Sequence, residues 1–337
     1  MTVPVPDVST AGGLIQLGNL FGPAKAVLTA VQLDLFTALH AHPSTAEEIR
    51  SRLALHGRGL TDFLHLLTAL GLLEKEDGRF RNAPGADRHL VRGGGSYVGG
   101  FLFGADLTLY PVYGRLAEAL RTGRPQADGD FEGMLNDPEA LGHFVRMMDG
   151  ASQSLGAELS TAVDWSGYRS VLDAGGCLGS VVGQLVAAHP HLMGHVFDLP
   201  QVEPFFHEHM GGLGLSGKVL FHPGDFFADP LPAADVVVYG HILHDWSPQQ
   251  RDHLVRLAYR ALSPGGALLV YDRMLPPGRD DAGSLVASLN MLLLTEGGGE
   301  YTAAEVSELA SAAGFVSIVD QPLGAQETLV ACRKPPS

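Results

Sequence analysis

This chain has few cysteines, no net positive charge and no long apolar run. Its 337 residues include two cysteines, Cys177 and Cys332, too few for a disulfide framework, so we expect a reducing, cytoplasmic location. The formal net charge of −15 repels phosphate backbones and argues against a nucleic-acid partner. The sequence has no uninterrupted apolar run of about 18 residues, so we expect no membrane span and no membrane partner.

The first part of the chain has the pattern of a small helical domain. Residues 21–40 place apolar side chains at helical spacing, and the segment 44–48, Ser-Thr-Ala-Glu-Glu, resembles a capping box. An apolar helix at 61–73 and a turn at 74–81 complete the outline of a winged helix over residues 1–95. Nine Lys or Arg balance nine Asp or Glu within residues 1–100, which leaves no basic stripe for DNA. We therefore expect a packing and dimerisation module.

Helical connectors follow over residues 96–165, and the pattern then changes. From about residue 169 apolar strands such as SVLDAG, GHVFDLP and ALLVYDRML alternate with helical segments. Such alternation is typical of a parallel sheet that is covered on both faces. We predict an α/β protein in which residues 166–337 form a doubly wound, Rossmann-like catalytic domain.

A glycine-rich turn follows the first of these strands. Gly175, Gly176 and Gly179 let the backbone turn tightly and approach a ligand closely. Asp198 ends the next strand, where a carboxylate can accept hydrogen bonds from both hydroxyls of a ribose. These features indicate a cofactor that contains adenosine. They leave a nicotinamide dinucleotide and S-adenosylmethionine open, although the dinucleotide spacing G-x-G-x-x-G is absent.

Four motifs narrow the function further. They are FDLP at 197–200, GDFF at 224–227, LHDW at 243–246 and GG-x-E-x-T at 297–302. With them the chain resembles, over nearly its whole length, the small-molecule O-methyltransferase family that includes plant caffeic acid and bacterial polyketide and antibiotic O-methyltransferases. The resemblance implies S-adenosylmethionine as the cofactor, a small-molecule substrate and a homodimer.

The resemblance also implies which residues hold the cofactor. Backbone at Gly175 would face its methionine part, and Asp198 would take its ribose hydroxyls. The adenine would lie beside Leu199, Asp225 and Phe226. The loop departs from the family pattern at residues 177–178, Cys-Leu, where the family has a third small residue.

His244 matches the family's catalytic base, and Asp272 and Glu300 match two acidic residues that orient it. An imidazole with an ordinary pKa of about 6.5 can take a proton from a hydroxyl. An acid on the far ring nitrogen would fix its tautomer and stabilise the imidazolium. Asp272 is shorter than the Glu that is commoner in the family. We expect Asp245 to be the N-cap of a helix over 247–262.

Other interpretations stay open at this point. His241 and His244 could share a metal with a neighbouring carboxylate, although we predict no metal site. The acceptor could be a carbon beside the carbonyl of a 2-oxo acid, with metal assistance, or the chain could bind a nucleoside without catalysis. His207 and His209 are expected to point to opposite sides of a helix and to be solvated.

Overall fold

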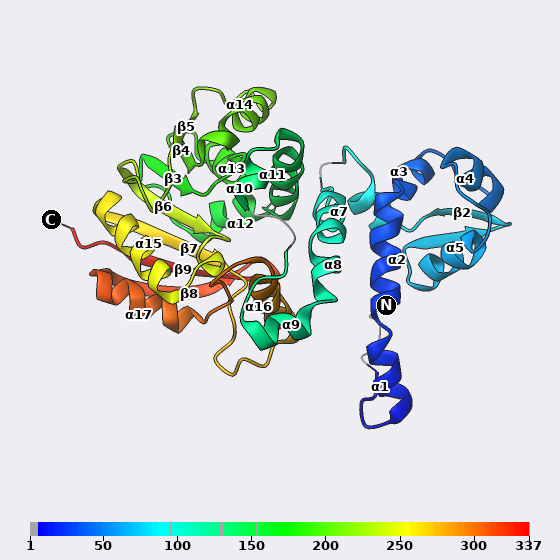
Figure 1. The fold of residues 1–337 in the computed structure, drawn as a ribbon. Helices are drawn as coiled ribbons and strands as arrows, with labels where there is room; N and C mark the ends of the chain where they lie inside the picture. The colour runs from blue at the N-terminus through cyan, green and yellow to red at the C-terminus, as the bar shows by residue number, and fades with distance from the viewer. Residues whose placement is uncertain (1–5, 95, 128–130, 153, 337) are drawn as a thin grey trace. The chain divides into compact units, whose positions relative to one another are not determined.

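The computed structural model describes residues 6–94, 96–127, 131–152 and 154–336. The chain divides into two compact units, Met1–Pro111 and Val112–Ser337, and Figure 1 shows the elements of each. The segment that we expected to be helical, 96–165, holds the helices α7 to α12. The division into three parts with boundaries after 95 and 165 stays a prediction.

The N-terminal unit contains the predicted winged-helix outline. Helices α4 and α5 precede the antiparallel hairpin β1–β2. Thr45 caps α4, because its side chain accepts a hydrogen bond from the Glu48 N–H while the Glu48 carboxylate accepts one from the Thr45 N–H. The hairpin turns at Asp77 and Gly78, both with positive φ, as a two-residue hairpin turn requires. The elements of this unit are α1 (Ala11–Gly18), α2 (Phe21–Gln32), α3 (Leu35–His40), α4 (Ala46–Arg52), α5 (Leu60–Ala69), β1 (Leu73–Glu76), β2 (Arg79–Asn82), α6 (Pro84–Leu90) and α7 (Gly99–Leu107).

Helices α1 and α2 carry an apolar surface. Ile15 is 65% exposed and Phe21 is 62% exposed. Within the described residues, the stretch Ala11–Gln32 is long and apolar enough to cross a membrane by length and composition alone, and little of it is buried. The expectation from uninterrupted runs missed it because polar residues such as Lys25 interrupt the stretch. Exposed apolar patches of this kind commonly mark a contact with a partner.

The C-terminal unit is built on a seven-stranded sheet in the order β5-β4-β3-β6-β7-β9-β8. The first five of these strands are parallel, and of these β3, β4, β6 and β7 were predicted, whereas β9 is antiparallel to β7 and to β8. A three-residue connection joins β8 to β9, and so short a connection permits only an antiparallel pair. The strands are β3 (Ser170–Ala174), β4 (Met193–Asp198), β5 (Val219–Pro223), β6 (Ala234–Gly240), β7 (Leu262–Asp272), β8 (Val316–Leu323) and β9 (Glu327–Arg333).

Helices cover both faces of this sheet, which explains why its strands are apolar on both sides. In β6, Val236 and Val238 pack with residues of α12, α13 and α14, while Val237 and Tyr239 pack with residues of α15 and α17. The helical elements of this part of the chain are α8 (Leu109–Tyr113), α9 (Leu116–Thr122), α10 (Phe131–Leu135), α11 (Pro138–Ser152), α12 (Leu155–Ala162), α13 (Ser180–Ala188), η1 (Pro200–Val202), α14 (Glu203–Gly212), η2 (Leu243–Asp245), α15 (Pro248–Ala261), α16 (Ala282–Leu294) and α17 (Ala303–Ala313).

The strand order reverses between β3 and β6, because β3 pairs with β4 on one side and with β6 on the other. In open α/β sheets, ligands bind outside the carboxyl ends of the strands at such a point. The carboxyl ends of β3, β4, β5, β6 and β7, and the segments that follow them, lie at this edge and carry the predicted site residues.

Candidate active site

The loop after β3 has a backbone shaped by positive φ angles at Gly175, Cys177 and Gly179. A Cβ atom at Gly175 would lie 2.2 Å from Cδ1 of Ile242, so only glycine fits at this point. Cys177 takes the left-handed conformation without being glycine, which costs of order 1 kcal/mol or more. The loop therefore places bare backbone beside the ends of β3 and β6.

Asp198 lies at the end of β4 and faces this loop. One oxygen of its carboxylate accepts a hydrogen bond from the Cys177 N–H at 2.8 Å, and the other accepts one from the Leu199 N–H at 2.7 Å. Each oxygen keeps a second lone pair for a ligand. Burial raises the pKa of Asp198 to about 6. A partly buried carboxylate fixed by two backbone N–H groups is preorganised to accept hydrogen bonds from two hydroxyl groups.

The ends of β3, β4 and β5 bring the other predicted cofactor residues to the same place. The Gly224 N–H donates to the Asp198 carbonyl at 2.9 Å, which sets Asp225 and Phe226 next to the end of β4. The Phe226 ring lies 3.5 Å from the position of a Cβ at Gly175 and 6.0 Å from the Phe197 ring centroid to centroid. Asp225 accepts from the Phe227 N–H at 2.9 Å, which stabilises the turn.

Sequence reasoning assigned no role to Asp173, which lies beneath the glycine loop. Its side chain is buried, and burial together with the charge of Asp198 raises its pKa to about 7. A Cβ at Gly176 would lie 2.7 Å from the Asp173 carboxyl carbon. A charged residue at the end of an otherwise apolar strand, next to two glycines, was the available signal.

His244 lies in the short 3-10 helix η2 after β6, beside the two acidic residues expected to orient it. Its Nδ1 is 2.8 Å from Oε1 of Glu300 and 3.3 Å from Oδ1 of Asp272. Both carboxylates thus lie at one nitrogen, and the shorter Asp side chain reaches the ring. Nε2 has no carboxylate so close: it is 3.8 Å from Oδ1 of Asp245.

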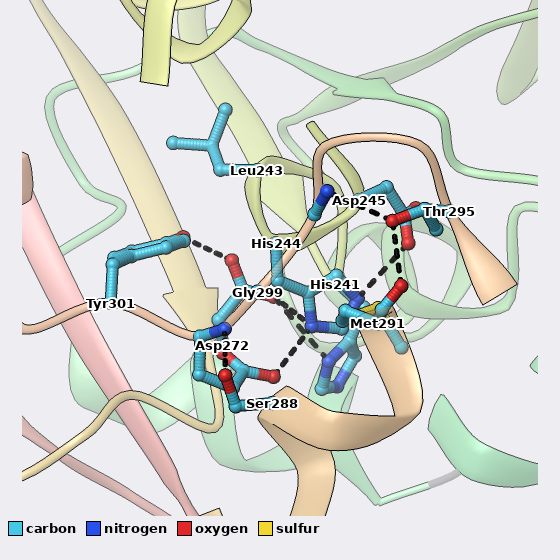
Figure 2. Close-up of polar contacts among 12 residues, drawn as sticks. His241, Leu243, His244, Asp245, Asp272, Ser288, Met291, Thr295, Gly299 and Tyr301 are labelled. Carbon is cyan, nitrogen blue, oxygen red and sulfur yellow. Dashed lines mark hydrogen bonds and ion pairs between the residues drawn. The ribbon is translucent and has the colours of Figure 1, made fainter. Parts of the chain in front are cut away.

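Asp272, the last residue of β7, is fully buried between two imidazoles. Its Oδ1 is 3.6 Å from Nδ1 of His241 as well as 3.3 Å from Nδ1 of His244, and its Oδ2 accepts a hydrogen bond from the Tyr301 hydroxyl. Figure 2 shows these contacts. Burial raises the pKa of Asp272, and the charge of His244 opposes this.

The electrostatics make His244 strongly basic. Burial alone lowers the pKa of its imidazole, but Asp272, Asp245 and Glu300 together outweigh burial and raise it to about 10. The ligand-free protein therefore holds a proton on His244 at neutral pH. His241 differs, because burial lowers its pKa to about 4 and its imidazole is neutral.

Hydrogen bonds to backbone groups join the segment that carries His244 to the segment that carries Glu300. The Gly299 N–H donates to the His244 carbonyl at 2.8 Å, and the Glu300 N–H donates to the Ser288 hydroxyl at 3.0 Å. Arg251 of α15 is buried and donates to the carbonyls of Leu243 and Gly299. Sequence reasoning missed Arg251, although an arginine on the apolar face of the predicted helix was a visible signal.

Asp245 does not cap the helix after LHDW, contrary to expectation. Ser247 is the N-cap of α15, its hydroxyl accepting from the Gln250 N–H while the Gln250 side chain accepts from the Ser247 N–H. Asp245 precedes the cap in η2, and its carboxylate is left beside Nε2 of His244. The capping box explains the error, because Ser-x-x-Gln is itself a helix start.

A metal would find three suitable atoms here, because His241, His244 and Asp272 each place one ligand atom within 4.8 Å of the others. Glu300 already holds Nδ1 of His244, so we keep the prediction of no metal site. His207 is exposed, as expected. The expectation for His209 was wrong: its Nε2 is 2.7 Å from the Ser180 hydroxyl, and its ring is partly buried.

Fold and site together define a class of protein: an S-adenosylmethionine-dependent methyltransferase that acts on small molecules. Two family models confirm the predicted enzyme class, and solved structures that resemble the chain confirm the predicted fold and cofactor. Residues 113–316 match an O-methyltransferase domain, and residues 15–92 match an O-methyltransferase dimerisation domain. The chain belongs to the O-methyltransferase family.

Known relatives match the chain over nearly its full length. The tetracenomycin polyketide synthesis 8-O-methyl transferase TcmO of Streptomyces glaucescens is 46% identical over 98% of this chain and 99% of its own. The N,N-dimethyltransferase OxyT of Streptomyces rimosus is 38% identical over 93% of each. The crystal structure of human N-acetylserotonin methyltransferase in complex with S-adenosylmethionine superposes with a TM-score of 0.89, at 27% identity and 96% coverage of both chains.

Proposed function

We propose that this enzyme methylates a hydroxyl group of an aromatic, polyketide-type metabolite and that His244 is its general base. One observation carries the proposal: Glu300 and Asp272 both approach Nδ1 of His244, at 2.8 and 3.3 Å. Nε2 is thereby the nitrogen left to take a proton from the acceptor. The resemblance to TcmO, whose name describes 8-O-methylation in polyketide synthesis, supports the acceptor class.

The residues after β3, β4 and β5 fit S-adenosylmethionine. Asp198 would accept from its ribose hydroxyls, Leu199, Asp225 and Phe226 would surround its adenine, and the backbone at Gly175 would face its methionine part. Gly175 has no side chain, because a Cβ would clash with Ile242, and the bare backbone at this position can face the cofactor closely. When bound, the cofactor supplies a methyl group on a sulfonium centre, an activated donor.

The chain's own residues then supply alignment and one proton transfer. A hydroxyl with a pKa near that of a phenol, about 10, is largely protonated at neutral pH. Neutral His244 would accept its proton at Nε2, and Glu300 and Asp272 would stabilise the imidazolium through Nδ1–H. A base with a raised pKa binds the proton more tightly, although a smaller fraction of that base is deprotonated at neutral pH.

Nitrogen is the second candidate acceptor atom. OxyT, described as an N,N-dimethyltransferase, is 38% identical to this chain. A protonated amine would also have to lose a proton before methyl transfer, so the same base would serve. C-methylation beside the carbonyl of a 2-oxo acid stays a further alternative, for which a metal at His241 and His244 would be needed.

We further infer a homodimer in the cytoplasm. The match of residues 15–92 to the dimerisation domain supports the dimer. The exposed apolar side chains of α1 and α2, such as Ile15 and Phe21, lie within that region and would be covered by a second copy.

The test is to offer the enzyme a panel of hydroxylated aromatic metabolites, amines and 2-oxo acids and to measure the release of S-adenosylhomocysteine with each. We expect turnover with the hydroxylated aromatics, and a His244→Ala variant should lose about 10²–10⁴-fold in kcat, the usual contribution of a general base. Cofactor affinity should not change. His207→Ala, on the exposed face of α14, is the control. Near-full activity of His244→Ala would assign the proton transfer to another group.

A further inference from the structure

A second imidazole, that of His241, and a further carboxyl group, that of Glu327, lie near the base, and the proposed mechanism does not use them. Nδ1 of His241 is 3.6 Å from Oδ1 of Asp272, and Nε2 of His241 is 3.9 Å from Oε1 of Glu327. His241 thus lies between two carboxylates, one of which also contacts His244. Both distances exceed a hydrogen bond but lie within the range of an ion pair.

The backbone holds His241 in a costly conformation. Its φ is +55°, a left-handed value that is uncommon for residues other than glycine and costs of order 1–3 kcal/mol. Its N–H donates to the Tyr271 carbonyl at 3.0 Å, and its ring meets the Tyr271 ring edge-on at 5.5 Å. Strain of this kind, kept in place by the surrounding packing, clusters at functional sites.

Glu327 ends the series of contacts that runs from His244 through Asp272 and His241. It is the first residue of β9, directly after the exposed turn 324–326, and its side chain is 14% exposed while that of Asp272 is fully buried. Its Oε2 is buried without a hydrogen-bond partner. Burial and the charge of Asp272 raise its pKa to about 7; Glu300 acts in the same direction, and Arg273 and His244 oppose it.

A neutral imidazole carries a single N–H and can donate to only one of two carboxylates. If Glu327 is protonated, its O–H donates to Nε2 of His241, and the ring's N–H is left to Nδ1, facing Asp272. If Glu327 is ionised, it draws the N–H to Nε2, and the bare Nδ1 turns a lone pair to Asp272. In that state Oδ1 of Asp272 has no competing donor and faces His244 alone.

We propose that His241 and Glu327 are positioning residues for the reaction. The protonation state of Glu327 determines which nitrogen of His241 carries the hydrogen, and thereby how strongly Asp272 stabilises the protonated form of His244. The proposal rests on His244 being the base, but its test can fail separately. Only protons move in the switch, and Glu327 exchanges its proton with solvent at the exposed turn.

The direct test is the nitrogen NMR spectrum of the full-length enzyme, with ¹⁵N-labelled histidine, between pH 6 and pH 8. The His241 signals, assigned with a His241→Asn variant, should pass from the Nδ1–H to the Nε2–H form as pH rises. Glu327→Gln has no ionising group at this position, so the His241 tautomer should stay the same across this pH range. Asp320→Asn, an exposed carboxylate on the same hairpin, should behave as the wild type.

Kinetics supply the second measurement. Because Glu327→Gln removes the ionisation that changes the His241 tautomer, the dependence of kcat/KM on pH should differ from that of the wild type between pH 6 and pH 8, with KM for the cofactor unchanged. A His241 tautomer that is identical in wild type and Glu327→Gln would overturn the proposal. So would a tautomer change that leaves the pH profile unmoved. A fully active His244→Ala would instead refute the proposed base.

Discussion

Oε1 of Glu300 lies 2.8 Å from Nδ1 of His244, although 56 residues separate the two in the chain. The carbonyl of His244 in turn accepts from the N–H of Gly299 at 2.8 Å, so the segment that carries the acid is tied to the segment that carries the base. Because Glu300 and Asp272 both act on Nδ1, the basicity of Nε2 depends on their charges.

The first prediction is a rise of kcat/KM with pH. The pKa of His244 in the folded protein is raised above its ordinary 6.5 to about 10, and the neutral imidazole is the competent form. Its fraction therefore increases from neutral pH upward and levels off above about 10. Glu300→Gln removes a charge that raises this pKa while keeping an acceptor for Nδ1–H, so its curve should level off at a lower pH.

The measurement is kcat/KM against pH for the wild type, Glu300→Gln and Asp272→Asn, since this quantity reports the free enzyme. Asp272→Asn should shift the curve in the same direction and cost less activity than His244→Ala, because it weakens the support for the base without deleting it. A profile that is flat from pH 7 to 10 in the wild type would contradict the role of His244.

The second prediction concerns cofactor affinity. Asp198→Ala should weaken S-adenosylmethionine and S-adenosylhomocysteine binding by about 1.5–3 kcal/mol, the range for hydrogen bonds to a charged group. Titration calorimetry would measure it, with Glu208→Gln on the exposed surface of α14 as the control. We expect no binding of NAD. An unchanged dissociation constant in Asp198→Ala would remove this carboxylate from the site.

The third prediction is that turnover needs no metal. The purified enzyme should contain far less than one equivalent of transition metal, and a chelator should leave its rate unchanged. If a chelator abolishes turnover and a metal restores it, the metal-assisted C-methylation reading takes the place of base catalysis. His241→Asn, which removes one of the three candidate ligand atoms, would then lower metal affinity.

The fourth prediction concerns assembly. Light scattering should give the mass of a dimer at micromolar concentration, because the apolar surface of α1 and α2 needs cover. Phe21→Glu, at a side chain 62% exposed, should shift the protein toward monomer. Leu213→Glu, at an apolar side chain 53% exposed in the other unit, should not. If the wild type has the mass of a monomer, the proposed homodimer is wrong, even though residues 15–92 match a dimerisation domain.

Much of the fold could be predicted from the sequence because its signals are local. The winged-helix outline follows from helical spacing, the capping box at Thr45 and the turn before Phe80. The parallel strands β3, β4, β6 and β7 are apolar on both faces and end at conspicuous residues such as Asp198. The resemblance to a family brought His244, Asp272 and Glu300 together, and the structure places them within hydrogen-bond or ion-pair distance.

What the sequence did not reveal depends on contacts between distant segments. Strand β5 was missed because its five residues include His222 and Pro223, which weaken a strand pattern, and it forms by pairing with β4. Helix α16 was not predicted. The burial of Arg251 and the approach of His241 to Glu327 appear only when β6, β7, α15 and β9 are assembled.

The capping box at Ser247 has a consequence for how this scaffold can diversify. Since Ser247 and Gln250 form the capping box that starts α15, the side chains of His244 and Asp245 are not needed to cap that helix. Asp245, whose carboxylate lies beside Nε2 of His244, can therefore be exchanged without losing the start of the helix, while His244 keeps its contacts with Glu300 and Asp272. A library randomised at position 245, with His244 and the cap kept intact, is the natural starting point for engineering a new regiochemistry.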